Sequence, residues 1–477
     1  MDVVTAPELA TVETFRIVSF DFDAARNIAR FNYAFDDTHS FQEVVEFAGS
    51  PLGSRAGPGI ESVLRLVHLA AGVSYYKAAA PGRIIIETGP LSRGEAGLVH
   101  DLYDKGLREF AMANGLEVPL QFEVEVEPEP GSVAEAAALG EVPASSLATG
   151  HGHDAPGEGV AVPIGGGKDS IVLVEALKAT NPPPGLATLL VAVNPQPAMR
   201  RTADIAGLPL ASITRTVSPR LLDLNSAGAL NGHVPITAIL SLIVVAAGYV
   251  YGYDTTLMAL ERSADEATSF VEDVAVNHQW SKSTECELGL RSVIRESVSR
   301  AIEYSSPLRS CGEIEIARWF ADLPAYHAGF RSCNQAYRSG TLFDAWCGRC
   351  PKCLFVFLML APFLAPDRLA AIFGENLLDN LQQVEGFRDL FAAGRKPYEC
   401  VGEQRESLLA FLLLLEHPNW RDASVVVALR PELERSRRAV VVDLDGNVPA
   451  IESAEATRER VVRFVAQLLT RDRRPEP

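Results

Sequence analysis

Three consecutive glycines, Gly165 to Gly167, stand in the stretch AVPIGGGKDS between an apolar segment and a helix-like one. Glycine lets the backbone approach an anion closely, and the amides at a helix start point toward that anion. Lys168 adds a compact positive charge for phosphate, and Asp169 is suited to hold Mg²⁺ indirectly. Asp169 and Ser170 are also candidate helix caps. We predict an ATP-binding loop formed by Gly165, Gly166, Gly167, Lys168, Asp169 and Ser170, in which Lys168 and Asp169 are also catalytic.

Two other phosphate-binding patterns do not fit this stretch. A Walker loop needs Gly where Val162 stands, and Ser or Thr where Asp169 follows the lysine. The G-x-G-x-x-G spacing of a dinucleotide fingerprint is absent. The stretch resembles the PP-loop of adenylating ATP pyrophosphatases, usually S-G-G-x-D-S, with Gly165 in place of the leading Ser. That resemblance implies a loop that holds the β,γ-pyrophosphate and leaves the α-phosphate open to an attacking carboxylate or carbonyl oxygen. A glycine turn without catalytic role is the alternative.

A second cluster reads C-x13-C-G-R-C-P-K-C, from Cys333 through Cys347 and Cys350 to Cys353. Two C-x-x-C steps present three thiolates on a tight turn, and Cys333 is available as a fourth. Such a set is typical of a closed, tetrahedral, structural Zn²⁺ site. Ordinary buried thiols, or a redox or iron–sulfur role, are the alternatives. The isolated cysteines, which we interpret as core or loop residues, are Cys286, Cys311 and Cys400.

Polar residues concentrate in three segments between these two motifs: NGH from 231, ERS from 261 and NHQWSKS from 277. Arg262 suits a carboxylate or a phosphate bidentately. Each residue taken singly is more often a cap, a surface charge or a core histidine. Downstream of an ATP loop, however, the three segments together favour a substrate site. The predicted proton-transfer groups are His233, His278 and Lys282. The predicted substrate contacts are Arg262, Ser263, Asn277 and Gln279.

The elements that must position these residues alternate between strand and helix. Short apolar strands are expected at 160–164, 189–193, 212–217 and 256–260, and helices at 170–179, 199–206 and 234–251. This alternation predicts an α/β fold with a doubly wound parallel sheet of PP-loop type. Ligands of such sheets bind at the carboxyl ends of strands. Because Asn194 follows the second strand there, it is a predicted cofactor contact.

Four regions follow from the composition. Residues 1–127 are predicted to be an α+β domain for substrate recognition, with strands at 14–22, 83–88 and 118–126 and helices at 60–71 and 94–114. Residues 128–159 contain no Lys or Arg and are interpreted as a linker or mobile loop. Residues 160–353 form the expected ATP-binding domain. Residues 354–477 are expected to be mainly helical (354–364, 405–415, 454–469), with a hairpin around Asp445-Gly446.

Composition limits the partners. The 477 residues carry a formal charge of −18, which disfavours nucleic acid as a partner and favours a small molecule. Residues 234–253 lack charge over a length that spans a bilayer, but polar residues dilute them and no basic cluster flanks them. We expect a buried helix and no membrane insertion. The N-terminus has no secretory signal, and clustered cysteines fit a reducing cytoplasm. The sequence leaves the oligomeric state open.

Five motifs in order, VPIGGGKDS, NGHVPIT, ERSADE, NHQWSKSTECE and WCGRCPKC, resemble the MurL family, most specifically over residues 160–353. Members of that family are ATP-dependent UDP-N-acetylmuramoyl-L-alanyl-L-glutamate epimerases of bacterial peptidoglycan synthesis. The resemblance implies a UDP-MurNAc-dipeptide substrate, with ATP and Mg²⁺ as cofactors. Its terminal L-Glu would be adenylated and its α-carbon inverted, and hydrolysis of the adenylate would give the D-glutamyl product, with AMP and diphosphate released. The basic pocket for the nucleotide is expected from Arg65, Lys77 or Arg83.

Two alternatives belong to other classes. The first is a PP-loop synthetase similar to 7-cyano-7-deazaguanine synthase, which also pairs such a loop with clustered cysteines. Long additional regions at both ends and the NHQWSKS segment argue against it. The second is a non-catalytic ATP- or zinc-binding interaction module, against which the intact Lys168 and Asp169 argue.

Overall fold

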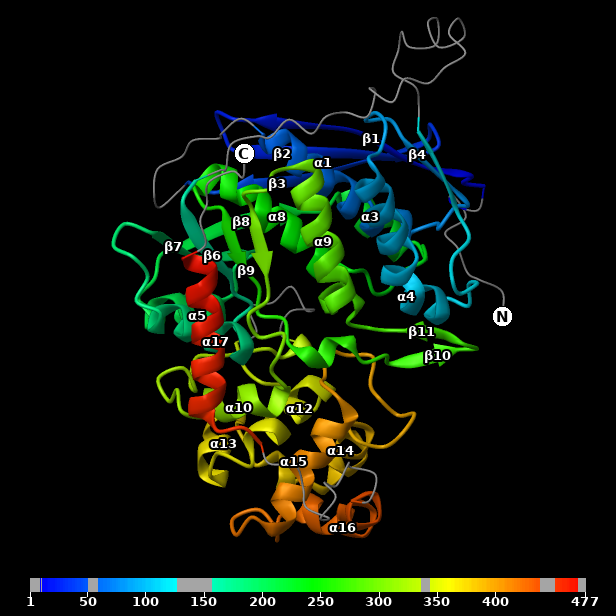
Figure 1. The fold of residues 1–477 in the computed structure, drawn as a ribbon. Coiled ribbons are helices and arrows are strands. Elements are labelled where there is room, and N and C mark those ends of the chain that lie inside the picture. Colours follow the sequence, from blue (N-terminus) through cyan, green and yellow to red (C-terminus); the bar gives the residue numbers. More distant parts are fainter. Residues whose placement is uncertain are drawn as a thin grey trace, which may run out of the picture.

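The computed structural model describes residues 9, 11–49, 59–126, 157–335, 344–437 and 451–470. Most of the predicted linker at 128–159 and the predicted hairpin around Asp445-Gly446 lie outside these residues. The described chain is an α/β structure with a large, mostly parallel sheet, as the sequence predicts. In Figure 1 this sheet and its helices fill the upper part of the molecule, and the C-terminal helices extend below.

Ten strands form this sheet in the order β12-β9-β6-β7-β8-β3-β2-β1-β4-β5. All neighbours from β12 to β8 are parallel, while β8, β3, β2 and β1 are joined by antiparallel pairs. The strands are β1 (Thr14–Asp23), β2 (Ile28–Phe35), β3 (His39–Phe47), β4 (Arg83–Ile86), β5 (Glu123–Val126), β6 (Gly159–Pro163), β7 (Ala187–Val193), β8 (Leu210–Thr216), β9 (Thr255–Leu257) and β12 (Glu303–Ser305). A separate hairpin pairs β10 (Ser269–Val271) with β11 (Val274–Val276).

The parallel half has a reversal of strand order that matters for ligand binding. From β6 the chain adds β7 and β8 on one side, then crosses to β9 and β12 on the other. The carboxyl ends of β6 and β9 therefore flank a topological switch point, where open α/β sheets bind ligands. The glycine loop follows β6, and Glu261 and Arg262 follow β9. Both predicted segments thus meet at the one edge where a crevice is expected.

Helices cover both faces of these parallel strands. Successive residues of a strand point to opposite faces, and β6 shows this directly: Val160 and Val162 belong to one hydrophobic core, Ala161 to the other. The first core contains α1 (Ile60–Ala71), α3 (Arg93–Tyr103), α8 (Ile236–Tyr251) and α9 (Thr284–Ser297). The second contains α5 (Lys168–Ala179) and α6 (Pro197–Ala206).

Local sequence explains where the main helices begin and end. The helix α8 follows Pro235 and stops at Gly252, whose φ of 81° is a left-handed cap. It is buried between sheet and helices, and no described helix is long and apolar enough to cross a membrane. The predicted helix at 94–114 is interrupted at Asp104 and continues as α4 (Arg108–Ala113).

The C-terminal region is helical, as predicted. Its helices α12 to α16 lie at the lower end of Figure 1, and α17 returns upward beside α5. They are α10 (Glu313–Ala321), α12 (Pro351–Leu360), α13 (Pro366–Phe373), α14 (Val384–Asp389), α15 (Gln404–Glu416), α16 (Ser424–Ser436) and α17 (Ala454–Leu469). The pairing of β3 with β8 joins the N-terminal strands and the parallel half into one sheet. The domain boundaries at residues 127, 160 and 353 stay predictions.

Candidate active site

The glycine loop is built as a tight passage from strand to helix. Gly166 has a backbone φ of 77°, which residues other than glycine rarely adopt. A Cβ at Gly167, the N-cap of α5, would lie 3.3 Å from the Cβ of Ser332. Arg331 donates its amide to the Gly166 carbonyl at 2.8 Å, so the segment before Cys333 packs against the loop. The helix begins at Lys168, two residues earlier than the sequence predicts.

Lys168 is buried between two carboxylates. Its Nζ contacts Asp169 and also Glu313, which is 145 positions further along the chain at the start of α10. Burial alone lowers the pKa of Lys168, but the charges of Asp169 and Glu313 outweigh it and raise the pKa above its ordinary value. Burial raises the pKa of Glu313 to about 6. The loop lysine is therefore a member of an ion triad.

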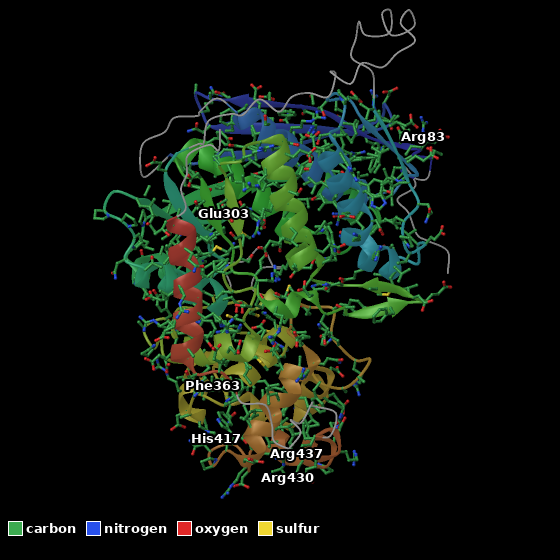
Figure 2. All side chains as sticks on the ribbon, in the orientation of Figure 1. Arg83, Glu303, Phe363, His417, Arg430 and Arg437 are labelled. Carbon is green, nitrogen blue, oxygen red and sulfur yellow. The ribbon has the colours of Figure 1, made fainter. Side chains whose placement is uncertain are left out.

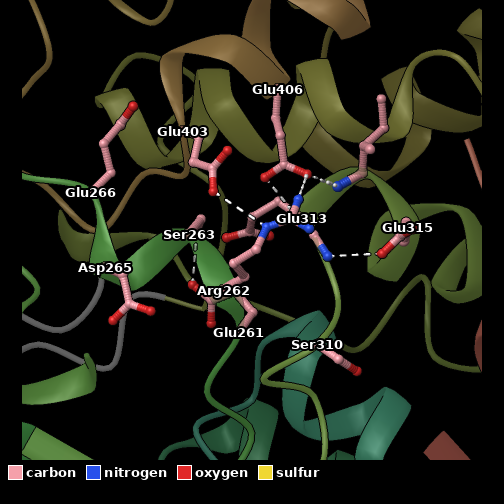
Figure 3. A network of polar contacts seen from close by, with 12 residues as sticks. Glu261, Arg262, Ser263, Asp265, Glu266, Ser310, Glu313, Glu315, Glu403 and Glu406 are labelled. Atoms are coloured by element: carbon pink, nitrogen blue, oxygen red, sulfur yellow. Dashed lines mark hydrogen bonds and ion pairs between the residues drawn. The ribbon is translucent and has the colours of Figure 1, made fainter. Parts of the chain in front are cut away.

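A second buried carboxylate, Glu406 of α15, caps the helix that carries Glu313. Its oxygens accept the amides of Glu313 at 3.1 Å and Ile314 at 3.4 Å. Burial, with Glu313 and Glu403 nearby, raises the pKa of Glu406 to about 7. Arg262 lies 3.5 Å from Glu403 and 3.9 Å from Glu406, and Figure 3 shows it reaching toward both. Half of the Arg262 side chain is exposed.

Other predicted substrate contacts already bind protein groups. The hydroxyl of Ser263 donates to Glu261 at 3.0 Å (Figure 3). The amide group of Asn277 donates to the Ala264 carbonyl at 2.8 Å. Ser263 and Asn277 therefore hold the backbone after β9 in place.

Two histidines from distant segments meet near this edge. The rings of His233 and His278 have centroids 4.3 Å apart. His278 Nδ1 lies 2.5 Å from Oε2 of Glu109, in α4. Burial, with His278 and Lys282 nearby, lowers the pKa of His233 to about 3. His278 differs: burial alone lowers its pKa, but hydrogen bonds to Cys400 and Glu109 outweigh it and raise the pKa to about 9.

Cys400 belongs to this cluster, although the sequence suggests only a core or loop residue. Its thiol lies beside the side chains of His278 and Lys282 and interacts electrostatically with both. Gln279 binds the neighbouring Val401 carbonyl through Nε2 at 2.8 Å. Its Oε1 accepts from Lys282 at 3.4 Å. The segment before α15 is thereby fastened to the NHQWSKS segment.

The three basic residues predicted for the nucleotide pocket separate in space. Lys77 contacts Asn231 and donates to the Gly232 carbonyl at 3.3 Å, beside His233; burial lowers its pKa to about 8. Arg65 binds Glu95 at 3.1 Å. Arg83 is exposed on β4, paired with Glu125 at 2.8 Å, and Figure 2 labels it near the upper edge of the molecule. Only Lys77 joins the histidine cluster.

Asn194 lies at the carboxyl end of β7, where the sequence places it. Its amide group donates to the Arg215 carbonyl at 3.0 Å and accepts the Arg215 amide at 2.9 Å. The side chain thus bridges to the end of β8.

The four clustered cysteines come together as their spacing predicts. Sulfur–sulfur distances are 3.9 Å from Cys333 to Cys350, 3.6 Å from Cys347 to Cys353 and 3.5 Å from Cys350 to Cys353. Zinc–sulfur bonds of about 2.3 Å in a tetrahedron place sulfurs about 3.8 Å apart. All four sulfurs lie within 4.8 Å of one another. These three distances fit a tetrahedral Zn²⁺ site.

The structure brings most predicted site residues to one edge and adds others that sequence reasoning missed. Acidic residues are common at helix starts, so Glu313 and Glu109 gave no distinct signal. Glu406 lies within the predicted helix at 405–415. Hydrophobic periodicity identifies the apolar face of such a helix and does not single out one buried carboxylate. Cys400 stands alone in the sequence. These residues become recognisable through their long-range contacts.

Comparisons with known proteins give a consistent result. Profiles described as the MurL N-terminal domain and the MurL C-terminal domain match residues 7–307 and 329–442. A UDP-N-acetyl-alpha-D-muramoyl-L-alanyl-L-glutamate epimerase of Salinispora tropica is 40% identical over 428 residues, covering 88% of this chain and 89% of the relative. Enzymes of the same name from a Micromonospora species and Xanthomonas oryzae pv. oryzae are 39% and 38% identical, covering 88% and 87% of this chain and 91% and 88% of each relative. No solved structure matches significantly.

Proposed function

The chain belongs to the MurL family, and from that premise we propose that it inverts the terminal L-glutamyl residue of UDP-N-acetylmuramoyl-L-alanyl-L-glutamate to D-glutamyl, in peptidoglycan precursor synthesis. We propose further that ATP adenylates the substrate and that AMP and pyrophosphate leave. One observation carries this proposal: a glycine loop that resembles a PP-loop and a cluster of titratable groups lie at the same edge of the sheet.

The loop meets the steric needs of a phosphate site. The first amides of a helix lack intrahelical partners, and α5 begins at Lys168 directly after three glycines. A Cβ at Gly165 would meet nothing within 4 Å, so that side of the loop has room. Phosphate oxygens would accept hydrogen bonds from these amides. The ammonium group of Lys168 would also attract them. ATP is the nucleotide that the PP-loop resemblance indicates.

The ion triad also supports a role for Mg²⁺. One ammonium and two carboxylates leave the group of Lys168, Asp169 and Glu313 with excess negative charge when both acids are ionised. A triphosphate beside it needs a divalent cation to offset both charges, and oxygen ligands are those that Mg²⁺ prefers. Asp169 and Glu313 would hold that ion.

Adenylation explains how a carboxylic acid without a pyridoxal cofactor loses its α-proton. A carbanion formed next to a free carboxylate would place two negative charges side by side. The mixed anhydride with AMP removes that charge and acidifies the α-hydrogen. A base then takes the proton, and a proton returns to the other face. Arg262, half exposed beside buried carboxylates, is suited to bind a carboxylate or phosphate of the substrate.

We propose a structural zinc ion in the cluster of Cys333, Cys347, Cys350 and Cys353. It would fix the segment before Cys333, whose Arg331 amide holds the Gly166 carbonyl. The metal site thereby supports the glycine loop from outside and takes no part in the reaction.

The direct test uses the purified protein with the UDP-MurNAc-dipeptide, ATP and MgCl₂. We expect D-glutamate after acid hydrolysis and chiral separation, with AMP and pyrophosphate formed in equal amounts. Incubation in D₂O should place deuterium at the glutamyl α-carbon only when ATP is present. Absence of the D-isomer would refute epimerisation. Formation of the D-isomer without ATP would refute the adenylation step alone.

A further inference from the structure

Four side chains from separate parts of the chain meet beside the glycine loop: Glu109 of α4, His278, Lys282 and Cys400. His278 lies between a carboxylate and a thiol. Its Nδ1 is 2.5 Å from Glu109, and its ring also lies beside the Cys400 thiol, with which it interacts. A carboxylate only accepts hydrogen bonds, so Nδ1 carries a hydrogen and the other ring nitrogen is available to the thiol. This carboxylate–imidazole–thiol series is the arrangement that activates a cysteine.

The same geometry argues against a metal ion bound jointly by His278 Nδ1 and Glu109 Oε2, although ligand atoms of Glu109, His233 and His278 lie within 4.8 Å of one another. Two ligands bound at about 2.0–2.1 Å in a tetrahedral site are separated by about 3.3 Å. The His278 and Glu109 atoms are 2.5 Å apart, which is a charge-assisted hydrogen bond.

Lys282 gives the thiol a second charged partner. Burial alone raises the pKa of Cys400, but Lys282 and His278 outweigh it and lower the pKa to about 6. The pKa of His278 is raised to about 9, as described above. At neutral pH the pair is therefore a thiolate and an imidazolium. The charge of Lys352 also acts on the thiol and further lowers its pKa.

Cys400 is also less buried than the histidine beside it. It is partly exposed, while His278 is buried. Two other cysteines outside the zinc cluster, Cys286 and Cys311, are 4% and 0% exposed and lie in the hydrophobic cores. Among these thiols, only Cys400 combines access with charged partners.

The thiol and the glycine loop share their surroundings. Lys282 and Lys352 each act on the charge of Asp169, the loop aspartate, as well as on Cys400. An acyl group activated at the loop has its α-carbon one bond from the reacting carbonyl carbon. Because the thiol and Asp169 share these two cationic neighbours, Cys400 is a candidate base for that carbon.

We propose that Cys400 is the catalytic base that removes the α-proton of the activated glutamyl residue, an inference that rests on the proposed function. The Cα–H bond breaks and the S–H bond forms, while the electron pair of Cα–H moves toward the carbonyl oxygen as an enolate. Protonation of that enolate on the opposite face by a solvent-exchangeable acid gives the D-isomer. His278, Glu109 and Lys282 are positioning residues that hold the thiolate.

The test separates adenylation from proton removal. Cys400→Ala and the near-isosteric Cys400→Ser are compared with the wild-type protein and with Cys286→Ala, which deletes a buried thiol in α9. ATP–pyrophosphate exchange with the L-substrate reports adenylation, and deuterium at the α-carbon reports proton removal. We expect both Cys400 variants to keep pyrophosphate exchange within about twofold of wild type. Their α-deuterium exchange should fall about 10²- to 10⁴-fold, the usual contribution of a positioned base. Cys286→Ala should match wild type in both assays.

Several outcomes would overturn the inference. Deuterium exchange by Cys400→Ala at the wild-type rate excludes the thiol as base. Loss of pyrophosphate exchange together with deuterium exchange, in a variant that melts like wild type, assigns Cys400 to an earlier step. An acyl adduct on Cys400 in the intact mass of wild-type protein during turnover assigns it a nucleophilic role instead. If wild type itself forms no D-isomer, the proposed function fails, and that result is distinct from the three others.

Discussion

Lys168 and Glu313 form an ion pair in which both side chains are only 2% exposed, although 145 positions of sequence separate them. A lysine in a phosphate-binding loop is expected to face its ligand. Here it also neutralises a buried carboxylate at the start of another helix. The charge of the loop is thus set jointly by α5 and α10, and the stability of the fold is linked to the site.

The first prediction concerns this pair. Lys168→Ala leaves Glu313 and Asp169 buried without their cation, and we expect a loss of about 3–5 kcal/mol in the free energy of unfolding. The double variant Lys168→Ala/Glu313→Gln removes one of the unpaired charges and should recover part of that loss. Neither protein should form AMP. Urea unfolding and AMP release measure the two effects, and a single variant as stable as wild type would contradict the buried pairing.

The second prediction uses the raised pKa of Glu406. The unfolded carboxyl titrates near 4.5 and the folded one near 7, so between these values the folded protein keeps a proton that the unfolded chain has released. Stability from this group is present below pH 4.5 and is lost as the pH rises through 7. At about 1.4 kcal/mol per pKa unit, the change is about 3 kcal/mol.

Glu406→Gln keeps an oxygen for the α10 amides and removes the titration. The free energy of unfolding of the variant, measured in urea, should therefore rise relative to that of wild type as the pH increases from 5 to 8. Glu416→Gln, a substitution at an exposed carboxylate of the same helix, should show no such trend. Equal behaviour of the two variants would argue against a raised pKa at Glu406.

A third prediction contrasts two adjacent glycines. Gly165→Ser introduces the hydroxyl usual in PP-loops where a Cβ meets nothing within 4 Å, so melting temperature and ATP affinity should be maintained or improved. Gly166→Ser places a side chain at a φ of 77°, at a cost of about 1–2 kcal/mol, and should weaken ATP binding. Calorimetric ATP titration distinguishes them. Tolerance of Gly166→Ser would mean that the loop conformation is not required.

The fourth prediction concerns the cysteine cluster. We expect one zinc per chain by elemental analysis, since the sulfur distances of 3.5–3.9 Å fit a tetrahedral ion. Removal by a chelator should lower the melting temperature, make these thiols reactive and weaken ATP binding through the contact between Arg331 and Gly166. Cys353→Ser should do the same, while Cys286→Ser should keep the metal. A metal-free protein of unchanged stability would leave the cluster as four ordinary thiols.

The fifth prediction is the alkylation profile of Cys400. Because the thiolate reacts, iodoacetamide labelling should rise with pH around a midpoint near 6 and level off above 7. Burial raises the pKa of Cys311 to about 11, so that thiol should stay unlabelled and serves as internal control. Lys282→Gln removes the main charge that stabilises the thiolate and should move the midpoint upward. A midpoint near 9 in wild type, by peptide mass spectrometry, would exclude the charged pair.

The sequence by itself determined the alternation of strands and helices, the α/β class and the position of the glycine loop, because hydrophobic periodicity and glycine or proline breaks act over a few residues. The spacing of Cys347, Cys350 and Cys353 likewise specified a compact thiol cluster. The same reasoning did not identify β2 or β3, whose role depends on pairing with β1 and β8.

Only the tertiary structure decided which side chains share the site. Glu313 reaches Lys168, and Glu109 reaches His278 across 169 positions, through the packing of helices that meet at the switch point of the sheet. Cys400 acquires its charged partners in the same way. Such contacts leave no periodic trace in the chain, because their free energy arises when distant segments bury the same charges together. Local pattern therefore placed the glycine loop, and burial between distant elements placed Glu313 beside its lysine and charged side chains around Cys400.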